Sequence, residues 1–136
     1  MLVAVLLLPL AAGLFNIGTL QSVAVKGRVL CDGEPMKGVK LKLYEVENVL
    51  DELMDERYSD GNGTFFLEGK ATEITPIDPK LNIYHRCRYD GMCYKKLEIE
   101  IPENFITNGD VPRKIFDIGE LNLAGAYSGE AVDCIN

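Results

Sequence analysis

Hydrophobic and polar residues alternate along several short segments of this chain, a pattern typical of half-buried β-strands. In residues 22–31, valines and a cysteine share one face, and Lys26 and Arg28 lie on the other. Residues 39–44 alternate more cleanly, with valine and leucine separated by lysine. We expect each segment to form a strand with one face toward a core.

Four later segments repeat this alternation: residues 64–67, 81–87, 97–101 and 115–123. The last is expected to bend or bulge at Gly119, because a glycine inside a strand often marks such a site. Residues 46–56 show no clear period. They are expected to form an irregular connection that runs into a short strand near Arg57.

Glycine-rich turns separate these segments, most clearly at residues 60–63, Asp-Gly-Asn-Gly. Asp-Gly and Asn-Gly pairs tolerate the positive φ angles that tight hairpin turns require. About seven short strands, roughly ten residues apart and with little helix between them, are typical of a β-sandwich. The sequence therefore predicts an all-β fold, a two-sheet antiparallel sandwich.

An uncharged apolar leader occupies residues 2–15, and the first charged residue is Lys26. It lacks the usual basic start of a signal peptide but has the apolar stretch of about 7–15 residues. Polar residues interrupt it before the roughly 20 residues that a membrane span needs. We expect a cleaved signal peptide over residues 1–18, one secreted domain over residues 19–136, and cleavage after Gly13 or Gly18.

Four cysteines follow the leader: Cys31, Cys87, Cys93 and Cys134. An even number of cysteines behind an export signal indicates two disulfides in an oxidising compartment. Three pairings are possible. Cys87 and Cys93 flank a loop of five residues, where opposed hairpin positions can meet the geometry of a disulfide.

Composition excludes several function classes. The net charge is −7, with acidic and basic residues interleaved, which argues against a nucleic-acid-binding protein.

The lone histidine, His85, falls on the apolar face of its strand and is expected to be a buried structural residue. Oxidised cysteines are not nucleophiles. The glycine-rich turn fails as a calcium loop, because its twelfth position is Ala71. We therefore expect no enzymatic activity and no cofactor or metal site.

Several motifs, in order along the chain, resemble the nematode transthyretin-like family: residues 22–31, 38–44, 60–65 and 85–93. The resemblance covers nearly all of residues 22–134. It implies a small secreted protein with a transthyretin-like (prealbumin-like) sandwich, and most members of the family have no assigned biochemical activity. Related hydrolases that act on hydroxyisourate need several histidines and a C-terminal Tyr-Arg-Gly-Ser, which this chain lacks.

The resemblance also bears on the disulfides. It implies that the first and last long strands are neighbours in one sheet, so that Cys31 can reach the C-terminal tail. This favours Cys31–Cys134 together with Cys87–Cys93. The rival pairing, Cys31–Cys87 with Cys93–Cys134, stays open.

Two surface features carry further expectations. Asn62-Gly63-Thr64 is an N-glycosylation sequon on an exposed turn, although hairpin geometry alone explains the same residues.

A basic and aromatic group of residues clusters around one hairpin: Tyr84, Arg86, Arg88, Tyr89, Lys95 and Lys96. This group could contact phosphate headgroups or an acidic partner. It could equally be a solvated sheet face on which Glu98 and Glu100 neutralise the basic residues.

The most specific function that these observations favour is a secreted, non-enzymatic binding or signalling protein with an extracellular or cell-surface protein partner. The alternative is an extracellular bridging factor that binds anionic phospholipid and a cell-surface receptor. That alternative would depend on the basic hairpin.

Overall fold

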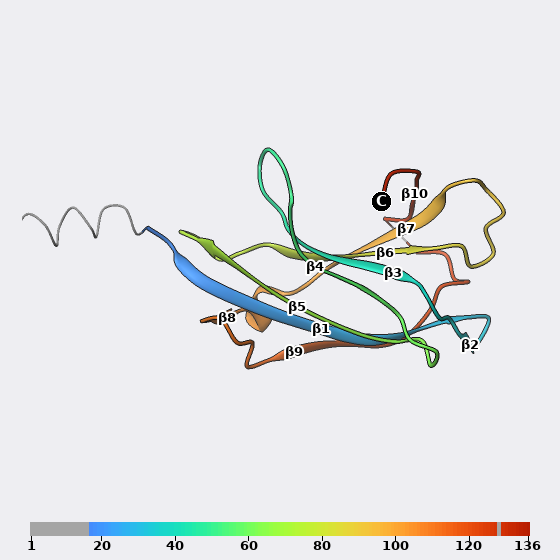
Figure 1. Cartoon of the computed structure of the whole chain (residues 1–136), viewed down its shortest axis with the longest axis horizontal. Helices are drawn as coiled ribbons and strands as arrows, with labels where there is room; N and C mark the ends of the chain where they lie inside the picture. Colours follow the sequence, from blue (N-terminus) through green and yellow to red (C-terminus); the bar gives the residue numbers. More distant parts are fainter. Residues whose placement is uncertain (1–16, 128) are drawn as a thin grey trace, which may run out of the picture.

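A computed structural model describes residues 17–127 and 129–136, which form a sandwich of two five-stranded sheets (Figure 1). Its elements are β1 (Thr19–Cys31), β2 (Glu34–Pro35), β3 (Lys40–Glu45), β4 (Glu52–Tyr58), β5 (Thr64–Glu73), β6 (Pro79–His85), β7 (Tyr94–Glu100), a 3₁₀ turn η1 (Glu103–Phe105), β8 (Thr107–Asn108), β9 (Ile115–Asn122) and β10 (Ala131–Asp133). The predicted all-β, two-sheet sandwich is confirmed. Its long strands are β1, β3, β4, β5, β6, β7 and β9.

The two sheets have different organisation. In sheet A, β1 is central and pairs with β2, β5, β8 and β9. Sheet B has the order β10-β7-β6-β3-β4. Among the described strands, all pairings are antiparallel except that of β1 with β9, which is parallel. The first and last long strands are therefore neighbours, as the resemblance implied.

The core lies between the sheets and contains the apolar faces that the alternation predicted. Val23, Val25 and Val29 of β1 are fully buried, as are Leu41 of β3 and Ile83 of β6. Full burial of such a side chain stabilises the fold by about 1.5–3 kcal/mol. The hydrophobic pattern thus fixes which face of each sheet points inward.

Two strands are longer than the sequence indicated. The segment expected to be irregular forms β4, which pairs along β3 with a register shift between Leu43 and Tyr44. Strand β5 extends to Glu73 because β1 pairs with it along ten consecutive positions, Thr19–Arg28. Long-range pairing thus extends segments whose own alternation is weak.

The sandwich closes where β4 approaches β5. The backbone N–H of Glu68 donates to Oδ2 of Asp55 across this gap at 3.1 Å. Gly69 is required here, because a Cβ at this position would collide with the side chain of Met54. A larger residue would push the two sheets apart along this side.

The predicted tight turn and bulge are both confirmed. Oδ1 of Asp60 accepts the backbone N–H groups of Asn62 and Thr64, each at 2.9 Å. Gly63 has φ +76°, and a Cβ there would collide with the carbonyl of Val29. The register of β9 against β1 shifts around Gly119, which has φ +78°.

The favoured disulfide pairing is wrong, and the structure has the rival pairing. Cys31 bonds to Cys87 with their Cα atoms 5.7 Å apart, and Cys93 bonds to Cys134 with a Cα separation of 4.5 Å. The bridged residues are 56 and 41 positions apart. By the chain-entropy model each closed loop of this size stabilises the fold by about 4 kcal/mol.

Local backbone geometry explains the error. The ladder between β6 and β7 ends at His85 and Lys95, so Cys87 is never held opposite Cys93. Beyond His85 the chain turns through Arg88, which has φ +51°, toward the end of β1. The tail does not stay in sheet A either. As β10 it pairs with β7, with Asp133 opposite Tyr94, which leaves Cys134 next to Cys93.

Residues 1–16 of the predicted signal peptide lie outside the described residues, so its processing stays a prediction. In the part of the chain that the structure describes, no helix has the length and apolarity of a membrane crossing.

Candidate functional site

The outer face of sheet B carries a trough whose floor comes from the polar residues of β3, β6 and β7. Strand alternation directs one set of side chains away from the core: Tyr44 of β3, Lys80, Asn82 and Tyr84 of β6, and Lys96 and Glu98 of β7. These residues line a hollow of 510 Å³ together with Val49, Leu50, Asp51, Asp133 and Ile135. We call this hollow the trough.

Two residues of the floor are buried although they face away from the core. Asn82 and Tyr84 are each only 4 % exposed. Nδ2 of Asn82 donates to the hydroxyl of Tyr84 at 3.1 Å. Burial raises the pKa of Tyr84 to about 12, with Tyr44 and Asp133 adding to the rise. Tyr84 is therefore a neutral hydroxyl at physiological pH.

One hydrogen-bonding position on this floor is unused. Oδ1 of Asn82 is buried and has no hydrogen-bond partner among the described residues. A buried polar atom left unpaired costs about 1–3 kcal/mol. Asn82 lines the hollow, so a ligand group that displaces the side chains covering Oδ1 can supply the missing donor.

Two chain segments form the walls of the trough. The loop between β3 and β4 and the C-terminal segment both project from the side of sheet B that faces away from sheet A (Figure 1). Oδ2 of Asp51, in the loop, forms an ion pair with Nζ of Lys80 at 3.1 Å. Nζ of Lys40 donates to the carbonyl oxygen of Asn136 at 2.9 Å. Each wall is thus attached to sheet B by a lysine.

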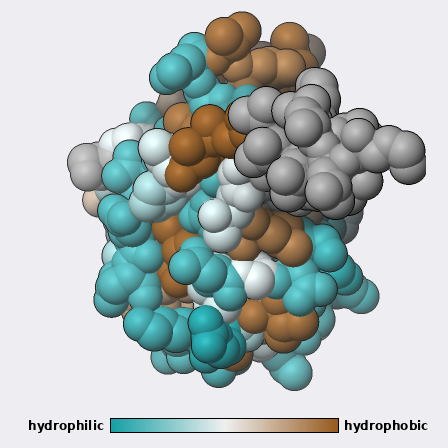
Figure 2. Space-filling model, turned by 90° about the vertical axis from the view of Figure 1, so that its left-hand side faces the viewer, coloured by the Kyte–Doolittle hydropathy of each residue, from teal (hydrophilic) through white to brown (hydrophobic). Residues whose placement is uncertain are grey.

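Exposed aliphatic residues form the rim. Val49 is 97 % exposed, Leu50 77 % and Ile135 92 %. Figure 2 shows hydrophobic surface at the top of the molecule, at the height of the loop between β3 and β4 in Figure 1. Apolar walls above a polar floor suit an amphipathic ligand.

The charged groups of the floor neutralise one another. Lys80 contacts Glu98 at 3.5 Å in addition to Asp51, and Lys96 contacts Glu98 at 3.5 Å. Although burial opposes it, the two carboxylates hold the pKa of Lys80 above its ordinary value. The floor therefore offers no unpaired lysine from this set to an anionic ligand.

The residues of the predicted basic hairpin lie on more than one face of sheet B. Lys95 and Lys96 point to opposite faces of β7, Lys95 beside His85 and Lys96 beside Tyr84. Arg88 forms a two-point ion pair with Asp32, with nitrogen–oxygen distances of 2.7 and 3.0 Å.

The remaining members of the hairpin group also lie apart. The guanidinium of Arg86 is exposed and stacks over the ring of Tyr94 at 4.6 Å. Tyr84 is buried in the floor of the trough, and Tyr89 is half-buried in the hairpin loop. The structure therefore pairs Tyr84 with Lys96 across neighbouring strands, whereas Arg86 contacts Tyr94 and Arg88 is paired with Asp32.

The sequon residue Asn62 lies on the exposed turn between β4 and β5. Its backbone carbonyl accepts a hydrogen bond from Nε of Arg28 at 2.8 Å. Its glycosylation stays a prediction.

His85 is buried, as expected, and its environment is unusual. Its Nδ1 accepts the N–H of Cys87 at 3.1 Å, so the neutral ring carries its proton on Nε2. That Nε2 lies 3.9 Å from Oε1 of Glu130, and neither atom has a hydrogen-bond partner in the described residues. Burial lowers the pKa of His85, Glu130 opposes this shift, and Lys95 adds to it.

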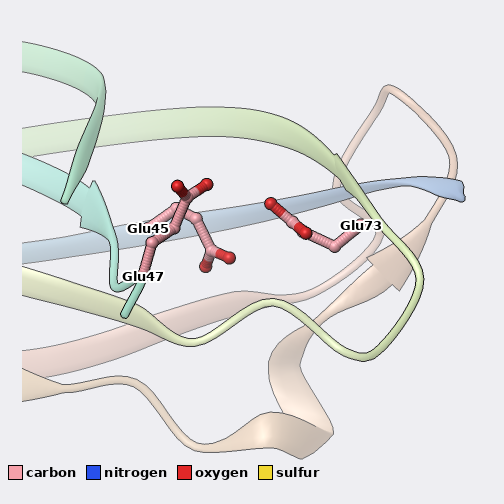
Figure 3. Close-up of side chains that lie close together, drawn as sticks. All are labelled: Glu45, Glu47 and Glu73. Atoms are coloured by element: carbon pink, nitrogen blue, oxygen red, sulfur yellow. The ribbon is translucent and has the colours of Figure 1, made fainter. Parts of the chain in front are cut away.

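A second polar group lies where β3 and β5 end. Carboxylate oxygens of Glu45, Glu47 and Glu73 come within 4.8 Å of one another (Figure 3). Burial raises the pKa of Glu45, and a hydrogen bond with Glu73 raises the pKa of Glu47. Such carboxylates can hold a divalent cation. However, Oε2 of Glu45 already accepts the N–H of Asp78 at 2.7 Å.

Sequence reasoning missed most of the trough. Of its lining residues, it singled out only Tyr84 and Lys96 as candidates, and it placed them in the basic hairpin. A usable signal was the pair of large polar side chains, Asn82 and Tyr84, on the outer face of a strand. The walls gave no comparable signal, because their position over the floor follows from tertiary contacts.

Comparison with known proteins shows to which family this chain is similar. The model of the TTR-52 transthyretin-like family matches residues 26–102. The chain is 43 % identical to transthyretin-like protein 5 of Caenorhabditis elegans over 136 residues, which covers 97 % of each protein. It is 38 % identical to transthyretin-like protein 2 of the same organism, over 92 % of this chain and 90 % of the relative.

Among solved structures, the chain is similar to part of a 9R-lipoxygenase from Cyanothece PCC8801. The TM-score is 0.43 and the identity 16 %, over 76 % of this chain and 16 % of that one. A likeness of this size supports no argument about fold or function. The matches to the family model and to the nematode proteins are far more extensive, and they show that this chain belongs to the transthyretin-like family.

Proposed function

We propose that this chain is a secreted, non-enzymatic binding protein and that the trough on sheet B holds its ligand. The observation that carries the proposal is the unpaired Oδ1 of Asn82, a buried residue that lines a 510 Å³ hollow. Small-molecule sites in proteins are typically hollows of about 300–1,000 Å³ with a few convergent polar groups. The trough fits that description.

The non-enzymatic part of the proposal rests on the chemistry of the reactive side chains. His85 has its Nδ1 engaged by the N–H of Cys87 and its Nε2 facing Glu130, and it is not among the lining residues of the trough, so a ligand held in the trough does not meet its imidazole. All four cysteines are in disulfides, and a disulfide sulfur is not a nucleophile. These features support binding rather than catalysis.

Secretion is tested by recovering the protein from the medium of expressing cells and sequencing its N-terminus. A mature chain that begins between Leu14 and Ser22 is expected. An intact Met1, or retention in the cell membrane, would contradict secretion.

The binding site is tested by affinity capture from extracellular fluid with the oxidised protein. Leu50→Ser removes an apolar wall of the trough. Ile74→Ser changes a residue of the same 77 % exposure that is not among the lining residues of the trough. Capture of bound small molecules should fall for Leu50→Ser and stay at the wild-type level for Ile74→Ser. Equal capture by both variants would exclude the trough.

The second candidate function is the bridging of anionic phospholipid to a cell-surface receptor. It is favoured by Arg86, whose exposed guanidinium is held over Tyr94. Binding to anionic vesicles should then weaken with salt, because the Debye length shortens from about 10 Å at 0.1 M to about 3 Å at 1 M. Arg86→Glu should abolish it. No preference for anionic over neutral vesicles at low salt would refute this candidate.

A further inference from the structure

The unused amide position of Asn82 requires a partner of definite chemistry. Its other amide atom is already bonded to the hydroxyl of Tyr84 at 3.1 Å. A ligand can therefore satisfy Asn82 with one hydrogen-bond donor at Oδ1. A hydroxyl, an amide N–H or an ammonium group could serve on this criterion alone.

The charged side chains beside Asn82 limit which head group a ligand can have. Lys80 is paired with Asp51 and Glu98, and Lys96 with Glu98. A carboxylate or phosphate head would have to break one of these pairs. An ammonium head would compete with Lys80 or Lys96 for the same carboxylates. Since an unpaired charge is costly in a partly buried site, a neutral head group is favoured.

The exposed aliphatic residues of the rim indicate the chemistry of the remaining part of the ligand. Leu50 and Ile135 belong to opposite walls, and Val49 stands beside Leu50. Side chains this exposed have little apolar contact in the free protein. An apolar chain placed between the walls would remove their surface from water, which is favourable in proportion to the area buried.

We propose that the trough binds a neutral amphipathic alcohol. The hydroxyl donates to Oδ1 of Asn82, and the hydrocarbon part lies between Leu50 and Ile135. This inference rests on the proposed function, since it assumes that the trough is the binding site, and it adds the chemical class of the ligand.

The first experiment compares head groups on one hydrocarbon chain. Octan-1-ol, octanoate and octylamine are titrated separately into the full-length oxidised protein, and Kd is measured by NMR chemical-shift changes. Octan-1-ol should bind about tenfold or more tightly than the two charged probes, because only it leaves the floor ion pairs intact. Equal or tighter binding of octanoate or octylamine would overturn the inference.

The second experiment uses variants of the floor and the rim. Asn82→Leu removes the acceptor with little change in volume and should weaken octan-1-ol binding about tenfold. Leu50→Ser is exposed and independent of the folding of the floor, so it decides the outcome if Asn82→Leu does not fold. It should weaken octan-1-ol binding several-fold, and the matched Ile74→Ser should leave Kd unchanged.

The outcomes separate the two proposals. If a charged probe binds best and Leu50→Ser weakens that binding, the trough is the site but the hydroxyl is not its ligand group. If Leu50→Ser and Ile74→Ser behave alike for all three probes, the trough does not bind amphiphiles, and the inference fails together with its assumed site.

Discussion

The two outer faces of the sandwich are made by the same strand alternation but have different consequences. On sheet A, a hollow of 360 Å³ is lined only by residues of β1, β5 and β9, among them Lys26, Phe66 and Asp117. On sheet B, the trough of 510 Å³ also includes a loop and the C-terminal segment. On sheet A the hollow is formed by neighbouring strands alone, whereas on sheet B segments from outside the strands of the floor add residues to the lining and enlarge the hollow.

The anchors of those walls are therefore the parts that distinguish sheet B. The loop depends on the ion pair between Asp51 and Lys80, and the tail on the disulfide between Cys93 and Cys134. Removing these anchors, with a matched change elsewhere in the molecule as control, tests whether they distinguish sheet B.

The largest effect is expected from the disulfides. Replacing Cys93 and Cys134 by alanine should lower the free energy of unfolding by about 4 kcal/mol, because the unfolded chain regains the entropy of a long loop. It should also abolish probe binding in the trough, since the tail loses its covalent anchor. Denaturant titration and NMR titration measure the two effects.

The matched change replaces Cys31 and Cys87 by alanine. It should reduce stability by a similar amount, about 4 kcal/mol, but leave probe binding in the folded protein intact. Loss of binding in both double variants would show that the disulfides act on the trough only through global stability.

A smaller effect is expected from ion pairs on the two faces. Lys80 has a side chain only 17 % exposed and contacts two carboxylates, so Lys80→Met should destabilise the fold by about 1–3 kcal/mol. Glu120→Gln breaks the exposed pair with Arg28 on sheet A and should cost under about 1 kcal/mol. Chemical denaturation of both variants checks this, and equal effects would argue that the loop has no special attachment.

The smallest effect concerns pH. Burial lowers the pKa of His85, so its contribution to stability is complete above the unfolded-state pKa of about 6.5 and is lost as pH falls through the folded-state value. The wild-type thermal midpoint should therefore fall more between pH 7.5 and pH 5 than that of His85→Gln.

Other titrating groups are common to both proteins in that comparison. The raised pKa of Glu45 acts in the opposite sense, because its contribution is complete below its unfolded-state pKa and is lost as pH rises. Parallel pH profiles for wild type and His85→Gln would show that His85 does not contribute to acid sensitivity.

The predictability of the candidate site differs from that of the fold. Tyr84 and Lys96 were recognised as candidates from their chemistry, but they were grouped with residues of the hairpin and not with the other lining residues of the trough. Arg86 and Arg88 are close to Tyr84 in sequence, yet the ladder ends at His85 and the chain turns away. Val49 and Leu50 gave only a blurred pattern, because their place above the floor depends on Lys80, thirty residues later in the chain.

The sequence by itself determined the all-β class, the inward faces of β1, β3 and β6, the turn at residues 60–63 and the bulge at Gly119. Each of these features follows from the period of the side chains along a strand or from the φ angles that a residue type prefers. Both are determined by residues that are close in sequence. Tertiary structure alone decided the disulfide pairing, the full length of β5 and the trough. These depend on which distant segments meet, as when β10 pairs with β7 and brings Cys134 to Cys93, and no local pattern encodes that meeting.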